Sequence, residues 1–360
     1  MLLLLSSGAR SRYREDIVRC LALPRGARLQ FRYDLTIVDQ AIVADVRSGK
    51  LIGQSALVCY LWNRVEGAPT EFAPCRMVQI VKAQIIGSSF IVLFEAGAYP
   101  RISDNVEFAT LLSDDAKRLP HWEREGAAYK LRGLFAVELT AKLAIDTSND
   151  LDAFEGVVKK LSQFSDFSGA KPCQFYAVAG VQAVNLDSDG NETFTTVSAT
   201  RHGSYVLTSG NEYELLIYVF APDQGPVAAI SETAIHVQSE NELIEFPLAK
   251  SREIDSEYDL KKFRFLTESN LWRITGALIV FVSPKHTIDD GASDITVPVI
   301  FQGRWAAGVG RTLLIAVGSS VPAMLAAAAS SKLNFGLGVL MFGAAIATGI
   351  GTVFLGSRKT

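Results

Sequence analysis

The C-terminal stretch NFGLGVLMFGAAIATGIGTVFLGSRKT, residues 334–360, carries no charged side chain until Arg358. A second uncharged run, residues 312–331, precedes it, and Lys332 is the only charged residue between the two runs. Each run is long enough for a membrane-spanning helix, which needs about 20 mostly apolar residues. The short link leaves room only for a turn, so we predict a two-helix transmembrane hairpin over residues 304–360.

The basic residues near this segment predict its orientation. Arg304 and Arg311 precede the first run, and Arg358 and Lys359 follow the second. Positive charge favours the cytoplasmic side of a membrane. The four leucines at the N-terminus are too few for a signal peptide, whose apolar region has about 7–15 residues. We therefore expect an inner-membrane protein whose body and two chain ends are cytoplasmic.

Small side chains recur along one face of the second run, at Gly336, Gly343, Ala347 and Gly351. Such a face lets helices approach closely in lipid. The partner is either the first run or another copy of the chain, which would make a homo-oligomer. Neither run contains an ionisable residue, which argues against an ion-coupled transporter. A hairpin buried inside a soluble protein is the alternative.

Residues 1–303 have the composition of an ordinary charged globular chain, with many β-branched and aromatic runs separated by turn signals such as DSDGN and APDQG. This pattern is typical of strand-rich domains. The predicted fold class is α+β and mostly β. Its parts are a small, barrel-like α+β domain (1–145), an amphipathic connector helix (146–169), a β-sandwich-like domain (170–303) and the transmembrane helical hairpin (304–360).

The connector helix is predicted from apolar residues that recur at helical spacing: Leu151, Phe154, Val158, Leu161 and Phe164. A threonine or serine at 147 or 148 would cap its N-terminus. We expect this helix to pack between the two domains. The alternative is a helix lying on a membrane surface, but such helices prefer Lys and Arg on their polar face.

The N-terminus provides the candidate ligand-binding residues. A small-residue loop at Ser6, Ser7 and Gly8 is followed by the start of a predicted helix and by Arg10, Arg12 and Arg14. Helix N-termini and arginines both bind anions. The predicted ligand is a phosphorylated small molecule or an anionic lipid headgroup, and the alternative is a solvated basic face. No Walker pattern is present, and the net charge of −3 makes nucleic acid an unlikely partner.

No residue pattern indicates catalysis, a metal or a cofactor. The four cysteines include no C-x-x-C pair, the four histidines are scattered, and G-x-S-x-G is absent. We therefore expect a membrane-anchored sensor or effector that binds a ligand or protein partner through its body. It would act by oligomerising, with membrane permeabilisation as one form of that action. The alternatives are a passive scaffold that holds a partner at the membrane, and an enzyme with an unrecognised site.

Overall fold

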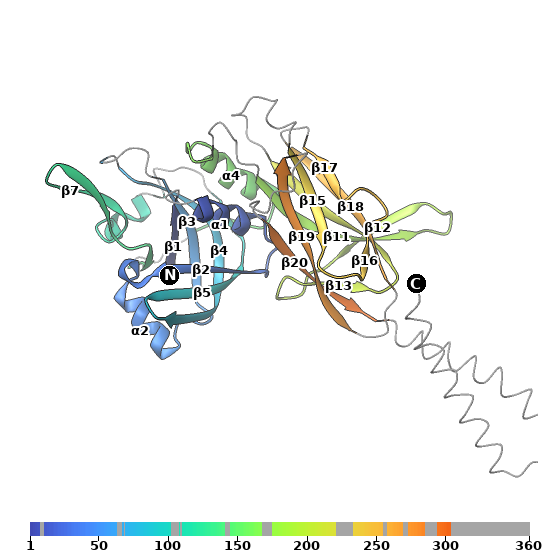
Figure 1. The fold of residues 1–360 in the computed structure, drawn as a ribbon, viewed down its shortest axis with the longest axis horizontal. Helices are drawn as coiled ribbons and strands as arrows, with labels where there is room; N and C mark the ends of the chain where they lie inside the picture. The colour runs from blue at the N-terminus through green and yellow to red at the C-terminus, as the bar shows by residue number, and fades with distance from the viewer. Residues whose placement is uncertain are drawn as a thin grey trace, which may run out of the picture.

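The structure is a computed structural model that describes residues 1–7, 11–62, 67, 69–101, 108, 110–140, 145–167, 175–220, 233–254, 258–268, 273–284 and 294–303. It is mostly β, with 54% strand and 16% helix. Two bodies lie side by side (Figure 1): a curved N-terminal sheet with its helices, called the barrel below, and a pair of sheets, called the sandwich.

The predicted fold class is wrong in its C-terminal part. No helix among the described residues is long and apolar enough to cross a membrane. The predicted hairpin over 304–360, with Gly336, Gly343, Ala347 and Gly351, lies outside the described residues. An uncharged run shows apolar content, but content alone does not establish that a spanning helix forms. Over the residues that it describes, the structure supports a β-rich fold without a membrane-spanning helix.

The barrel is one six-stranded sheet in the order β2-β5-β4-β3-β1-β9, in which β1 and β3 are parallel and the other pairs antiparallel. The strands are β1 (Leu2–Ser7), β2 (Arg28–Asp34), β3 (Ser55–Trp62), β4 (Glu71–Ile86), β5 (Ser89–Ala96) and β9 (Ala136–Glu138). Strand β1 is buried on both faces, since Leu2 and Leu4 belong to one apolar cluster and Leu3 and Leu5 to another. A strand covered on both sides is expected to be continuously apolar.

Backbone hydrogen bonds bring the two ends of this sheet together. Val38, just after β2, forms a parallel bridge with Ala136 of β9. Phe135 N donates to Ile37 O at 2.8 Å, and Asp39 N donates to Ala136 O at 2.9 Å. However, β9 pairs only with Leu2–Leu4, so the end of β1 extends beyond it. We call the opening between the end of β1 and strand β2 the seam.

Two helices belong to the barrel, α1 (Ser11–Ala22) and α2 (Gln40–Ser48), and a short 3-10 helix, η1 (Leu35–Ile37), follows β2. Asp39 caps α2 by accepting from Ala41 N, and Gly49 ends it in the left-handed conformation. The C-terminus of α1 meets the buried side chain of Arg76 from β4. The Arg76 guanidinium donates to the carbonyl oxygens of Cys20, Leu21 and Leu23.

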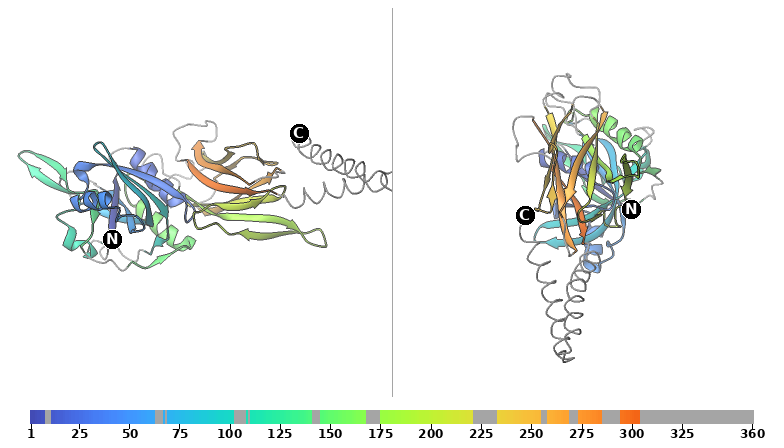
Figure 2. Two further views of the ribbon diagram at one scale, coloured as in Figure 1. Left: turned by 90° about the horizontal axis from the view of Figure 1, so that it is seen from below. Right: turned by 90° about the vertical axis from the view of Figure 1, so that its right-hand side faces the viewer.

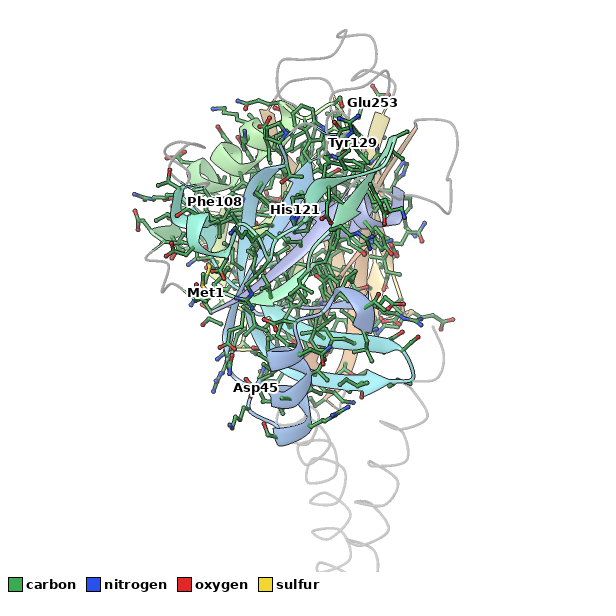
Figure 3. The ribbon with its side chains drawn as sticks, turned by 90° about the vertical axis from the view of Figure 1, so that its left-hand side faces the viewer. Met1, Asp45, Phe108, His121, Tyr129 and Glu253 are labelled. Carbon is green, nitrogen blue, oxygen red and sulfur yellow. The ribbon has the colours of Figure 1, made fainter. Side chains whose placement is uncertain are left out.

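The short pair of β6 (Tyr99–Pro100) and β10 (Thr147–Ser148) lies at the start of the helix α4 (Leu151–Ser162). The end of the barrel that is remote from the sandwich is covered by η2 (Ser113–Asp115) and by the hairpin of β7 (His121–Glu125) and β8 (Ala128–Arg132). Figure 3 looks at this end and shows Met1, Phe108 and His121 on it, with Tyr129 on the hairpin. Met1 and Phe108 belong to the apolar cluster that covers Leu3 and Leu5.

The helix α4 (Leu151–Ser162) is the expected connector, although it begins later than predicted. Asp150 caps it, not residue 147 or 148, and accepts from Ala153 N at 2.9 Å. Phe154, Val158 and Leu161 of its apolar face are fully buried. The Phe154 ring contacts Tyr99 of the barrel and Tyr218 of the sandwich, with centroids 5.5 and 6.2 Å away. The helix therefore packs against both bodies.

The sandwich has two five-stranded sheets, ordered β12-β11-β14-β18-β16 and β13-β20-β19-β15-β17. The first contains β11 (Phe175–Leu186), β12 (Glu192–Val197), β14 (Glu212–Phe220), β16 (Ile244–Glu245) and β18 (Tyr258–Thr267). The second contains β13 (Tyr205–Thr208), β15 (Thr233–Ser239), β17 (Ser251–Glu253), β19 (Ile274–Pro284) and β20 (Ile295–Gln302). Figure 2 shows the two sheets stacked beside the barrel.

Barrel and sandwich share one apolar cluster, which runs from Leu2 in β1 to Phe301 in β20. Polar contacts add to it, because Glu95 of β5 accepts from Arg28 at 3.0 Å and pairs with His202 of the sandwich at 2.7 Å. The backbones of Gly26 and Gly203 also touch. A continuous core with this many cross-contacts holds the two bodies in a fixed relation.

Candidate ligand-binding site

A cavity of about 180 Å³ lies at the seam of the barrel. Its walls come from the end of β1, the first half of α1, strand β2, η1 and the residue before β9. The lining residues are Leu5, Ser6, Ser7, Tyr13, Asp16, Phe31, Arg32, Tyr33, Asp34, Ile37 and Phe135. The seam therefore brings together segments that are separated by more than a hundred residues of sequence.

The local sequence explains how each wall is positioned. After four buried leucines, β1 ends on Ser6 and Ser7, and Ser6 Oγ donates to Tyr13 O at 2.8 Å, which fixes α1 against the strand. In β2, Phe31 and Tyr33 are buried while the residues between and after them are exposed. This alternation is the period of a strand with one covered face. Because β2 is an edge strand, side chains from both of its faces border the cavity.

The hydroxyl of Tyr33 is the most unusual group in the cavity wall. Tyr33 is 6% exposed, and its hydroxyl is buried without a hydrogen-bond partner among the residues that the structure describes. Burial raises the pKa of this hydroxyl well above its ordinary value, and the nearby Asp16 carboxylate raises it further. Leaving a buried polar group unpaired costs about 1–3 kcal/mol. An unpaired group of this kind calls for an explanation, and a water molecule or a ligand in the cavity would each supply a partner.

Three charged side chains border the cavity, Asp16, Arg32 and Asp34, so its described lining has a net charge of −1. Arg32 Nε donates to Ser89 Oγ at 3.0 Å. Asp34 Oδ1 accepts from the backbone N–H and the hydroxyl of Thr36, which lowers the pKa of the Asp34 carboxyl. Both bonds favour the charged form of the Asp34 carboxyl, which an exposed aspartate already adopts at neutral pH.

Asp16 belongs to a chain of three charges that leaves the cavity. Its Oδ1 accepts from Arg19 Nη1 at 3.3 Å, one turn further along α1. The same guanidinium donates to Asp294 in the sandwich, from Nη2 to Oδ1 at 2.9 Å and from Nε to the carbonyl oxygen at 3.2 Å. Helix α1 thus lines the cavity with one end and contacts the sandwich with the other.

The structure places only some of the predicted site residues at the seam cavity. Ser6 and Ser7 line the cavity, as an N-terminal binding site would require. Gly8 and Arg10 lie outside the described residues, as does the side chain of Arg12. Arg14 donates to Asp166 O at 2.9 Å, beside Tyr60, whose hydroxyl binds the Asp166 carboxylate. The anion or lipid-headgroup site stays a prediction.

Sequence reasoning missed the rest of the cavity. Tyr13, Asp16, Phe31 and Tyr33 were not singled out as site residues. A signal was present at the end of β2, where FRYD alternates aromatic and charged residues directly before a turn. Only the curvature of the sheet, however, brings that end beside Ser6 and Ser7.

A second cavity of about 430 Å³ lies beneath the β7–β8 hairpin, between Phe72, Leu119 and Trp122. Within the described ranges, no group of three or more His, Cys, Asp or Glu side chains is arranged to hold a metal ion. The described lining of the second cavity has no Asp, Glu, Lys or Arg side chain, whereas that of the seam cavity has three, so the seam cavity is the stronger candidate for a ligand site.

Comparison with known proteins gives no relative from which a role could be transferred. No protein-family model matches the chain, and no curated protein matches it in sequence.

Proposed function

We propose that this chain is a ligand-binding sensor. The barrel takes a small molecule in the seam cavity, and α1 passes the occupancy of that cavity to the sandwich. The observation that carries the proposal is the chain of charges Asp16–Arg19–Asp294, which begins at the cavity and ends in the second body. A ligand N–H that binds the Asp16 carboxylate competes with Arg19 for it, and so changes how Arg19 holds Asp294.

The packing around α1 supports this role. The helix contacts β1 and β4 of the barrel and β11 of the sandwich. Its C-terminus is fixed by the Arg76 guanidinium, which contacts three of its last carbonyl oxygens. A helix that is anchored at one end and bonded to the cavity at the other responds to the cavity as a unit. Such a two-site contact is what coupling between sites requires.

The proposal covers the described residues. The predicted partner, oligomer, lipid contact and membrane location stay predictions of the sequence.

Filling the cavity tests the binding step. Ser7 is 5% exposed and lines the cavity, so Ser7→Leu places apolar bulk where a ligand would lie. We expect a low-molecular-weight fraction of cell extract to raise the melting temperature of the full chain. At a ligand concentration of a hundred times Kd, the rise is about 5 °C. Ser7→Leu should show no rise.

The matched control is Ser55→Leu, because Ser55 is exposed on the same sheet away from the cavity. It should respond to the extract as the parent chain does. Near-ultraviolet circular dichroism checks that Ser7→Leu keeps its packing. The proposal fails if no fraction shifts the parent chain, or if the same fraction shifts a folded Ser7→Leu equally.

A further inference from the structure

The walls of the seam cavity are aromatic, which suits a flat ring. Tyr13, Phe31, Tyr33 and Phe135 all line it. Their positions are fixed from behind, since Phe31 meets Phe94 edge-on at 5.0 Å between centroids and Tyr33 stacks on Phe90 at 6.2 Å. Rings that are already held in place lose little entropy when a further ring packs against them.

The size of the cavity limits what it can take. The cavity volume is about 180 Å³. Drug-sized ligands occupy pockets of about 300–1,000 Å³. The cavity therefore holds a single ring system, and any larger substituent of the ligand must leave through the mouth.

The polar side chains that line the cavity determine which hydrogen-bonding groups a ligand ring would need at its edge. Asp16 and Asp34 are acceptors that favour N–H donors, and within the described lining they outnumber the cation Arg32. In the described part of the chain, Asp34 Oδ2 has no partner, because both Thr36 bonds go to Oδ1. The buried Tyr33 hydroxyl lacks a partner as well. An anionic ring would face two carboxylates, whereas a neutral ring with both donors and acceptors satisfies these groups.

We propose that the seam cavity binds an uncharged nitrogen heterocycle with an exocyclic amino group, the chemistry of an amino-bearing nucleobase. The Asp16 and Asp34 carboxylates accept from its N–H groups, and the Tyr33 hydroxyl donates to a ring nitrogen. The ring packs among the aromatic side chains. This inference rests on the proposed sensor function and adds the ligand class. The source is a free base or the base of a nucleoside, whose sugar would project from the mouth.

Calorimetric titration of the full chain tests the ligand class with defined probes. Adenine and cytosine represent the proposed chemistry, adenosine and cytidine the nucleoside source, benzoate an aromatic anion, and inorganic phosphate a simple anion. We expect at least one amino-bearing base or nucleoside to bind, and benzoate and phosphate to give no heat of binding. Binding of the nucleoside but not of the free base assigns the nucleoside as the source, and the reverse assigns the base.

Tyr33→Phe removes one oxygen atom and supplies the decisive variant. It should weaken binding of the heterocycle about tenfold or more, the usual effect of removing a hydrogen bond from a site that needs it. Without ligand, it should raise the melting temperature, because it removes an unpaired buried hydroxyl. A variant that is more stable but binds less tightly cannot be explained by damage to the fold. Tyr205→Phe, at a buried tyrosine of the sandwich, is the control and should leave affinity unchanged.

The results separate the two proposals. If a metabolite binds and Ser7→Leu abolishes its binding, while all four bases and nucleosides are inert, the sensor function stands and the ligand class is overturned. Binding of benzoate or phosphate alone overturns it too. If the heterocycle binds Tyr33→Phe as tightly as the parent chain, the hydroxyl has no role in binding and the inference is overturned.

Discussion

Arg76→Met is expected to lower the free energy of unfolding by about 3 kcal/mol or more. Arg76 is 2% exposed, and its guanidinium donates to Gly97 O at 3.0 Å and to Cys20 O and Leu23 O at 2.6 Å each. It also lies 4.4 Å from the centroid of the Tyr99 ring. Methionine fills much of the volume but donates no hydrogen bond, so buried carbonyl oxygens at the end of α1 lose their partner.

Urea unfolding followed by circular dichroism measures this loss. The control is Arg124→Met, at an exposed arginine of β7 whose side chain donates to Gly126 O at 3.3 Å. Its effect should stay within about 0.5 kcal/mol. Equal stability of the Arg76 and Arg124 variants would show that the carbonyl oxygens find other donors. The end of α1 would then not depend on the buried guanidinium.

Gly26→Ala is expected to cost about 2–4 kcal/mol, the second large effect. Gly26 has φ +84°, and a Cβ there would lie 2.6 Å from Arg201 O and from Gly203 N, both backbone atoms of the sandwich. Part of the cost is the left-handed conformation, about 1–2 kcal/mol for a residue with Cβ. The rest is overlap between barrel and sandwich, which typically costs 1–3 kcal/mol.

Gly53→Ala separates the two terms, because Gly53 has the same φ of +84° but nothing within 4 Å of an added Cβ. Gly53→Ala should lose only the stability that the left-handed conformation costs. The loss of unfolding free energy in Gly26→Ala should therefore be larger by about 2 kcal/mol, measured by thermal or chemical unfolding. If the two variants lose the same stability, the close backbone contact between the two bodies is absent in solution.

Local sequence patterns predicted much of the β structure. Strands β3 and β5 are apolar and aromatic runs, the pattern on which the prediction of a mostly β fold rests. The helix α2 was missed although its signals, Asp39 before it and Gly49 after it, stand in the sequence.

The site was less predictable because it depends on contacts between distant residues. Ser6 and Ser7 were identified from a loop and a helix start, and they do line the cavity. Their neighbours in space, Tyr33 and Phe135, are set by the closure of the sheet through Val38 and Ala136. Likewise, a single arginine in the sequence of β4 gives no sign that it is buried. The predicted C-terminal hairpin is an error of another kind, because a structural element was inferred from apolar composition alone.

Amide hydrogen exchange in Asp16→Asn and Asp34→Asn tests most directly whether the cavity is coupled to the sandwich. Both carboxylates line the cavity, but only Asp16 contacts Arg19 and, through it, Asp294. We expect Asp16→Asn to speed exchange at the start of β20 and in β11, because Arg19 loses one of the two carboxylates that orient it. Asp34→Asn should change exchange only around β2. Identical exchange in the sandwich for both variants and the parent chain would contradict the coupling.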